Sequence, residues 1–430
     1  MNDVLSSILS APRLPLNLLN FSSASVNSTD LTCFPLLSTG AALNVAYPNY
    51  LLSSYNAHLL SLPSPSSHVE ITGSFPNASF VEFTAYDLSN SYEELSSLVD
   101  FQLVPDRDGV NPFLEQPPSS ASPSSYTIRV STSPGSARNE LTCSSNCGII
   151  MRVFKNQSVF DPVASPVEYI KDMAWGNVEE PAVAFWDGAS SPLPGSCDAY
   201  RDWLYETLAE GQEGGEQLTN EGEGGGDEPE TEERVRRMYN QDDNWVATVG
   251  DKWRSGNAPL VNPLGSYLSS AANATHEWSS LAAKVTFLAP TVSGASRPIY
   301  DPRSHQVRFG AVVAGNRAGA MQAWSALSFG ALSVDGTGIA VVHVVGEGVE
   351  LPPECGGNVL RWPVGGEGGE TAYWPAVFVE QYLAQSQRVA KPEFVSGIAD
   401  VAGGGERAVE IGMGEYAPSI RYYKNYNEMC

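Results

Sequence analysis

The sequence lacks several features that would assign it to a large class of proteins. No apolar run approaches the roughly 18 residues that a membrane-spanning helix needs, so we predict no membrane span. Basic residues are scarce, with 24 Lys and Arg against 49 Asp and Glu, and the formal net charge of −25 argues against nucleic acid as a partner. Much of this charge is local, because residues 206–233 contain acidic residues and no basic ones.

Catalytic signatures are also missing. The chain contains no GxSxG, Walker loop, dinucleotide-binding GxGxxG or HExxH motif. Its 5 histidines are scattered and none of its 6 cysteines forms a CxxC pair, so we predict no metal site and no cofactor. These absences argue against motif-bearing hydrolases and nicotinamide enzymes. A hydrolase or isomerase with another kind of dyad stays open.

Cysteines and sequons indicate an oxidising compartment. An even cysteine count permits up to three disulfides, and Cys143 and Cys147 are close enough to close a small loop. The alternative is that most cysteines are free and buried. No signal peptide is visible at the start. We predict a secreted or secretory-pathway glycoprotein, with N-x-S/T sequons at Asn20, Asn27, Asn77, Asn156 and Asn273.

What the chain does contain is short strand patterns separated by turns. Residues 68–72 and 80–86 alternate or are rich in β-branched and aromatic residues, with Phe75-Pro76-Asn77 as a turn between them. Ser91 and Glu94 have capping-box spacing, which predicts a short helix carrying Leu95 and Leu98. Residues 101–103 are expected to form a further strand.

The second half repeats the first in outline. Four strand patterns recur in the same order: 284–288 corresponds to the strand at 68–72, 306–313 to 80–86, 338–345 to 126–131, and 375–383 to 148–154. A cysteine-bearing loop precedes the last strand in both copies, with Cys143 and Cys355. We therefore predict an all-β protein with two tandem jelly-roll-like β-sandwich domains joined by a partly helical linker.

The domain boundaries follow from composition. We predict an N-terminal sandwich at residues 1–160 and a C-terminal sandwich at 261–430. The linker at 161–260 would carry short helices and an acidic, disordered insertion at 211–228.

Several of these segments resemble a family of two-domain β proteins found in fungi and actinobacteria. The matching segments are GSFPNASFVEFTAYD, VDFQLVPDRDGVNPF, YTIRVS and GIIMRVF in the first half, and KVTFLAPTV, SHQVRFGAVV, NVLRWP and MGEYAP in the second. The chain departs from the family pattern at the acidic insertion and around residues 365–371. Within the family it resembles fungal hetero-Diels–Alderases of tropolonic sesquiterpene biosynthesis.

The resemblance implies a secondary-metabolism pericyclase that joins a quinone methide, derived from a tropolone or phenol, to a terpene alkene such as humulene. Such a reaction needs two hydrophobic substrates held in a near-attack pose, and hydrogen-bond donors where charge develops on the heterodiene oxygen. The alternative function is a secreted carbohydrate-binding or cell-wall glycoprotein without catalysis, because jelly rolls often bind sugars through exposed aromatic residues. A homodimer is compatible with either function.

Donors and aromatic residues supply the candidate site. As donors we select Arg361, Lys171, Arg152 and His343, although Arg152 inside an apolar strand is more typical of a structural ion pair and His343 between valines of a core histidine. As aromatic residues that line a substrate pocket we select Trp175, Trp186, Trp324, Trp362, Tyr373 and Trp374, which lie at predicted strand ends and connections.

Overall fold

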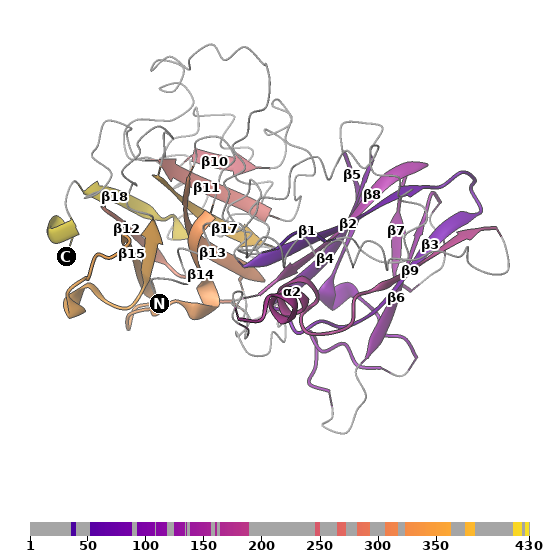
Figure 1. The fold of residues 1–430 in the computed structure, drawn as a ribbon, viewed down its shortest axis with the longest axis horizontal. Coiled ribbons are helices and arrows are strands. Elements are labelled where there is room, and N and C mark those ends of the chain that lie inside the picture. Colours follow the sequence, from indigo (N-terminus) through magenta and orange to yellow (C-terminus); the bar gives the residue numbers. More distant parts are fainter. Residues whose placement is uncertain are drawn as a thin grey trace, which may run out of the picture. The chain divides into compact units, whose positions relative to one another are not determined.

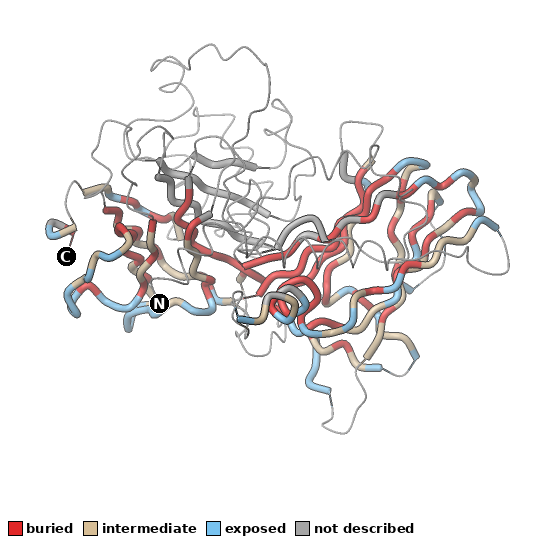
Figure 2. The backbone as a smooth tube through the Cα atoms, in the orientation of Figure 1, coloured by how far each residue is buried: buried red, intermediate tan, exposed pale blue. Residues whose placement is uncertain are grey.

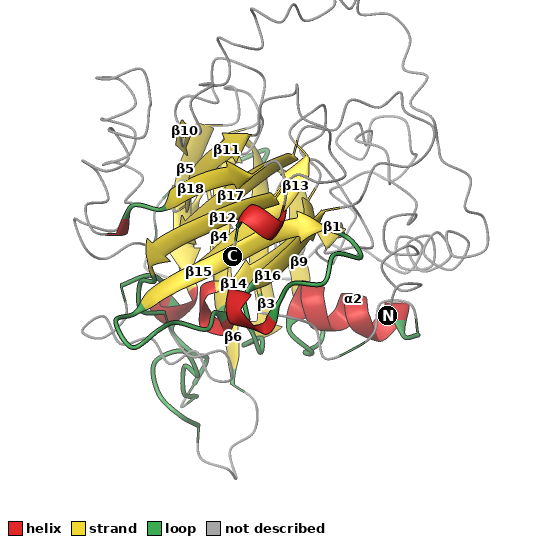
Figure 3. Cartoon of the chain, turned by 90° about the vertical axis from the view of Figure 1, so that its left-hand side faces the viewer, coloured by secondary structure: helices red, strands yellow, loops and turns green. Residues whose placement is uncertain are grey.

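The computed structural model describes residues 36–39, 52–87, 93–107, 109–117, 124–133, 135, 138–155, 160, 164–188, 246–249, 265–271, 282–292, 306–316, 323–362, 375–382, 416–423 and 426–429. They form two compact units, one built from residues 36–188 and the other from residues 246–292 and 306–429. Strands account for most of the described chain (Figure 3), which confirms the predicted all-β class.

Two sheets form the first unit (Figure 1). The five-stranded sheet has the order β1-β2-β8-β4-β5 and the four-stranded sheet the order β7-β6-β3-β9. All pairs are antiparallel except β6 with β7. The strands are β1 (Leu36–Thr39), β2 (Ser53–Ser61), β3 (Ser67–Ser74), β4 (Phe80–Asp87), β5 (Glu93–Val99), β6 (Ser125–Ser131), β7 (Glu140–Thr142), β8 (Asn146–Phe154) and β9 (Ala182–Asp187).

The inner faces of these sheets form one apolar core. Alternate residues of β4 and β8 point into it, among them Phe83 and Met151, and meet Ile71 and Ile128 from the four-stranded sheet. Figure 2 shows that burial continues along β4 and β8 without alternation, so both faces of the five-stranded sheet are covered there. A strand buried on both faces explains the nearly continuous apolar sequence of residues 148–154.

The described part of the first unit contains one α-helix, α2 (Pro166–Trp175). It begins at Pro166, where proline suits the first turn, and ends at Gly176 in the left-handed conformation. Ser54 Oγ and Asn56 Nδ2 each donate to the Ala174 carbonyl at 3.2 Å, and Lys155 pairs with Asp172. The helix and β9 thus extend the first unit past the boundary that we predicted at residue 160, because β9 pairs with residues 67–72 of β3.

The second unit repeats the two sheets. Its five-stranded sheet has the order β10-β11-β17-β13-β14 and its four-stranded sheet the order β16-β15-β12-β18. The strands are β10 (Val246–Val249), β11 (Gly265–Ala271), β12 (Ala282–Leu288), β13 (Phe309–Asn316), β14 (Ala323–Ser328), β15 (Ile339–Gly346), β16 (Val359–Trp362), β17 (Pro375–Tyr382) and β18 (Ser419–Tyr423). A core of Val285, Val342 and neighbouring apolar residues lies between the sheets.

The predicted repeat is confirmed strand by strand, since each strand of the second unit takes the place of its counterpart in the same sheet order.

A buried asparagine repeats as well. Asn139 binds Val104 N at 2.8 Å through Oδ1 and donates to the Val104 and Thr127 carbonyls through Nδ2. Asn358 makes the same three bonds with Ser333 and Val341. Each asparagine thus ties the segment that follows a short 3-10 turn, at Asp100–Gln102 or Phe329–Ala331, to strand β6 or β15. Further 3-10 turns lie at Pro353–Cys355 and Tyr426–Glu428.

Two local predictions were wrong. The helix expected from Ser91 and Glu94 is strand β5, because its residues pair with β4 and tertiary pairing outweighs a weak capping signal. Residues 101–103, which we expected to form a strand, belong largely to a 3-10 turn at Asp100–Gln102. The buried Asp100 in this turn accepts a hydrogen bond from Val81 N at 3.1 Å through Oδ2.

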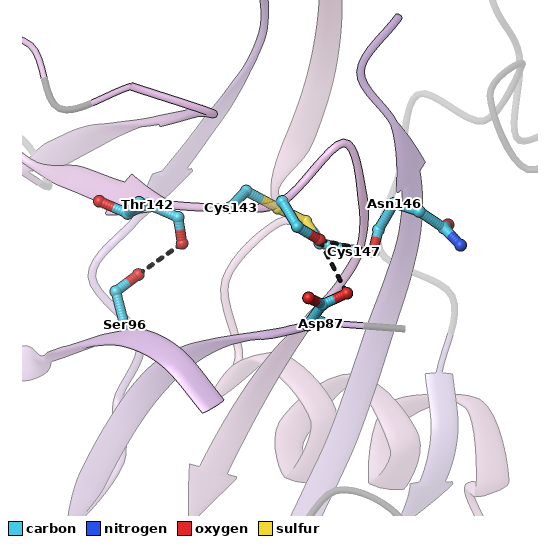
Figure 4. The surroundings of a disulfide bond; sticks show 7 residues. Asp87, Ser96, Thr142, Cys143, Asn146 and Cys147 are labelled. Carbon is cyan, nitrogen blue, oxygen red and sulfur yellow. Dashed lines mark hydrogen bonds between the residues drawn. A yellow bond between two sulfur atoms is a disulfide. The ribbon is translucent and has the colours of Figure 1, made fainter. Parts of the chain in front are cut away.

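Cys143 and Cys147 form a disulfide across a tight loop, with Cα atoms 5.9 Å apart (Figure 4). Ser144 Oγ donates to Asp87 Oδ1 at 3.1 Å, which ties this loop to the end of β4. Cys355 is also disulfide-bonded, and no described cysteine is free. The two loops are not equivalent in detail, because Cys143 follows β7 whereas Cys355 precedes β16.

Candidate functional site

The outer face of the first unit's five-stranded sheet carries a buried polar cluster. It consists of Arg152 on the central strand β8 and of Glu82, Thr84 and Tyr86 on β4; we call it the Arg152 cluster. The intervening residues of β4, Val81, Phe83 and Ala85, point to the opposite face and into the core. The two-residue period of a strand therefore sorts VEFTAY into a polar ladder and an apolar face.

The guanidinium of Arg152 contacts all three members of that ladder. Its Nη1 donates to Glu82 Oε1 at 2.6 Å and to Thr84 Oγ1 at 3.3 Å, and its Nη2 donates to Tyr86 Oη at 2.7 Å. Register explains the fit, because Glu82 lies directly opposite Arg152 and the other two residues follow at two-residue intervals. The guanidinium carbon also lies 5.6 Å from the centre of the Tyr86 ring.

Burial makes this arrangement unusual. Arg152 and Glu82 are both 0% exposed, so the ion pair is fully removed from solvent. Charges are rarely buried unless paired, and a buried pair is often no more stabilising than apolar residues of similar size. Stability alone therefore does not account for the cluster.

The surroundings are apolar and aromatic. Phe80 and Phe154 lie next along the same face, with ring centroids 5.4 Å apart and an interplanar angle of 26°. Ile150 lies directly across from Thr84 and is buried as well. In such a medium the hydrogen bonds from Arg152 are stronger than in water, and a tyrosine hydroxyl that accepts one becomes a better donor itself.

The four candidate donors do not converge on one site. Arg152 forms the ion pair that we considered as its alternative role. Lys171 is exposed on α2, and Arg361 on β16 donates to the Gly346 and Val349 carbonyls, where it braces a turn. His343 is buried on β15 in the second unit.

The candidate aromatic residues do not come together at one site either. Trp324 and Trp362 are part of the second unit's core. Trp175 is buried at the end of α2, and Trp186 lies half-buried on β9, parallel to the ring of His68 at 5.8 Å. Tyr373 and Trp374 lie outside the described residues, as do the sequons at Asn20, Asn27, Asn156 and Asn273. Asn77 is exposed in the turn between β3 and β4, as predicted.

Glu82 and Tyr86 were missing from the candidates that we derived from the sequence. Their signal was present in residues 81–86, where Glu82, Thr84 and Tyr86 alternate with the apolar residues Val81, Phe83 and Ala85. Without the β4–β8 register, however, nothing in the sequence pairs Glu82 with Arg152.

Within the described part of the chain, no group of three or more His, Cys, Asp or Glu side chains is placed to hold a metal ion. The described helices include none that is long and apolar enough to cross a membrane.

We compared the chain with protein families, curated proteins and solved structures. No protein-family model and no curated protein matches the chain. Two solved structures are similar over 98% of it: an uncharacterised protein from Burkholderia cenocepacia, with 11% identity, a TM-score of 0.50 and 94% of its own chain covered, and a protein from Vibrio parahaemolyticus, with 11% identity, a TM-score of 0.45 and 96% covered. At this identity, the likeness to the Burkholderia protein shows a shared all-β fold.

Proposed function

We propose that the protein is a cofactor-independent fungal pericyclase of secondary metabolism that catalyses an intermolecular hetero-Diels–Alder reaction between a quinone methide and a terpene alkene such as humulene. The observation that supports this proposal is the Arg152 cluster, which combines a guanidinium-polarised tyrosine hydroxyl with an aromatic, buried sheet face. The sequence resemblance described above points to the same reaction.

In the proposed mechanism the cluster acts on the heterodiene. The quinone methide oxygen gains negative charge as the new bonds form, and a donor placed at that oxygen stabilises the transition state more than the ground state. Tyr86 is the proposed donor, and Arg152 strengthens it by donating to its oxygen. Glu82 and Thr84 hold the guanidinium in place. Phe80 and Phe154 make the sheet face beside the cluster apolar and aromatic.

The primary experiment incubates the purified protein with a quinone-methide precursor and humulene, followed by chiral chromatography. A single enantioenriched cycloadduct that forms faster than in buffer supports the proposal. A racemic product at the background rate rejects it.

Tyr86→Phe tests the site itself. This variant keeps the aromatic ring and removes the hydroxyl, so we expect the catalysed rate to fall about 100-fold, as is typical when one oxyanion donor is lost. Tyr126→Phe is the matched control, because the Tyr126 hydroxyl is buried in the core and has no described hydrogen-bond partner. Full activity in Tyr86→Phe, or an equal loss in both variants, would contradict the role assigned to the Arg152 cluster.

The alternative function, a carbohydrate- or cell-wall-binding glycoprotein, is linked to a different feature. Trp186 and His68 stack in parallel on the outer face of the four-stranded sheet, where a sugar ring could pack against the indole. A glycan array separates the two functions, since binding that is lost in Trp186→Ala favours this alternative.

We also propose that the protein matures in the secretory pathway. The Cys143–Cys147 disulfide suits an oxidising compartment, and Asn77 presents its sequon in an exposed turn. After secretion from a fungal host, we expect Asn77→Gln to reduce the mass by one glycan relative to the wild type, measured before and after glycosidase treatment. An unchanged mass, with thiols reactive under native conditions, would contradict this localisation.

A further inference from the structure

A row of basic side chains crosses the outer face of the second unit's four-stranded sheet. The strand register places His343 of β15 opposite Lys284 of β12, and Lys284 opposite Arg421 of β18. Residues directly opposite in antiparallel strands share one face of the sheet. The other face belongs to the core, which contains the intervening residues Val342, Val344, Val285 and Ile420. We call His343, Lys284 and Arg421 the basic row.

Among the residues that the structure describes, no acidic side chain pairs with this row. Neither Lys284 nor Arg421 forms an ion pair or a side-chain hydrogen bond with any described residue. Like charges directly opposite each other destabilise a sheet. In a chain with a formal net charge of −25, three adjacent basic groups with no acidic partner among the described residues are unexpected.

The internal repeat provides a comparison within the same molecule. In the first unit the equivalent row reads Glu140, Arg129, Glu70 and Ala184, so that its charges alternate. The equivalence is fixed by the repeated asparagines, since the main-chain N–H of Arg129 donates to the Asn139 carbonyl as that of His343 does to Asn358. Where the first unit has acids, the second has Lys284 and Val359. The fold therefore does not require a basic row.

His343 adds an independent sign of a missing partner. The residue is only 3% exposed, and its Nδ1 has no described hydrogen-bond partner. Buried polar atoms are nearly always paired. Burial lowers the pKa of His343, and the positive charge of Lys284, which lies directly opposite on β12, lowers it as well.

Apolar residues border the row on the same face. In the next register position, Val345 and Ala282 are buried with Met429, and Tyr423 and Val359 pack against them. A ligand that covers both features would combine an anionic head with an apolar body.

We propose that the basic row is a binding site for a small organic anion. A carboxylate or phenolate head would bind Lys284 and Arg421 and lie beside the imidazole of His343, while its apolar body packs on the adjoining cluster. Arginine suits such a head because its planar fork matches two oxygens. The basic row shares no residue with the Arg152 cluster, so either proposal can fail without the other.

Calorimetric titration of the full chain at low salt tests the site, with benzoate as the probe. Benzamide, a neutral analogue, and inorganic phosphate, a head without a body, serve as comparison ligands. We expect benzoate to bind one site per chain at least tenfold more tightly than either of them. Equal binding of benzamide would overturn the anionic head, and equal binding of phosphate would overturn the apolar body.

Lys284→Glu tests the row with a residue that the first unit uses at the equivalent position. We expect it to abolish benzoate binding and to raise the midpoint of thermal unfolding, because alternating charges replace repulsion. A raised midpoint shows that lost binding is not caused by unfolding. Arg129→Gln, in the equivalent row of the first unit, should leave benzoate binding unchanged. Retained binding in Lys284→Glu, or equal loss in both variants, would overturn the proposal.

Discussion

Replacing Arg152 with methionine is expected to lower the free energy of unfolding by about 3–5 kcal/mol, because it leaves the Glu82 carboxylate charged or forced to take up a proton in a fully buried position. The hydrogen bonds to Thr84 and Tyr86 are lost as well. Chemical denaturation of the full chain measures the effect.

The double variant Arg152→Met/Glu82→Leu is the control. With both charges replaced by apolar groups of similar volume, we expect most of the lost stability to return. If the Arg152 cluster serves catalysis, the double variant will be stable and inactive. A double variant as unstable as Arg152→Met alone would show that the ion pair is itself needed for folding, and a stable, active one would remove the cluster from the proposed mechanism.

Gly176→Ala is expected to destabilise the first unit by about 3 kcal/mol, which combines the strain of a left-handed alanine with steric overlap. Gly176 ends α2 with φ of 61°. A Cβ atom there would lie 2.7 Å from the Asn77 main-chain nitrogen and 2.7 Å from Pro76 Cβ, in the turn between β3 and β4. Neither neighbour can rotate away, and the bond from Asn77 N to the Gly176 carbonyl would also be disturbed.

Gly188→Ala separates the two contributions. Gly188 follows β9 in the same unit with φ of 66°, but its nearest neighbour is the Ser66 hydroxyl at 3.0 Å, which can rotate. We expect a loss of about 1–2 kcal/mol from backbone strain alone. Equal losses in both variants, measured by urea denaturation, would show that the contact between α2 and the β3–β4 turn contributes nothing.

The sequence predicted some elements well because their signals are local. Alternation in residues 126–131 and a continuous apolar run in 148–154 specify strands β6 and β8 before any partner is known. The same reasoning failed for β5, because a capping-box pattern at Ser91 and Glu94 is worth little against a full edge of hydrogen bonds to β4.

The candidate site could be predicted only in part. Arg152 stands out as a charge inside an apolar strand, but its partner Glu82 lies 70 residues earlier and is identified only by the β4–β8 register. The aromatic candidates show the same limit. Trp324 and Trp362 sit at strand ends in the sequence, yet the packing of the two sheets places both in the core.

By itself, the sequence determined the all-β class, the twofold internal repeat and the close Cys143–Cys147 pair, since each depends on the order and period of residues along the chain. Only the tertiary structure decided which charges meet. Lys284 and Glu70 occupy equivalent strand positions, but one joins a row of like charge and the other a balanced row, because strand register brings together residues from distant parts of the chain.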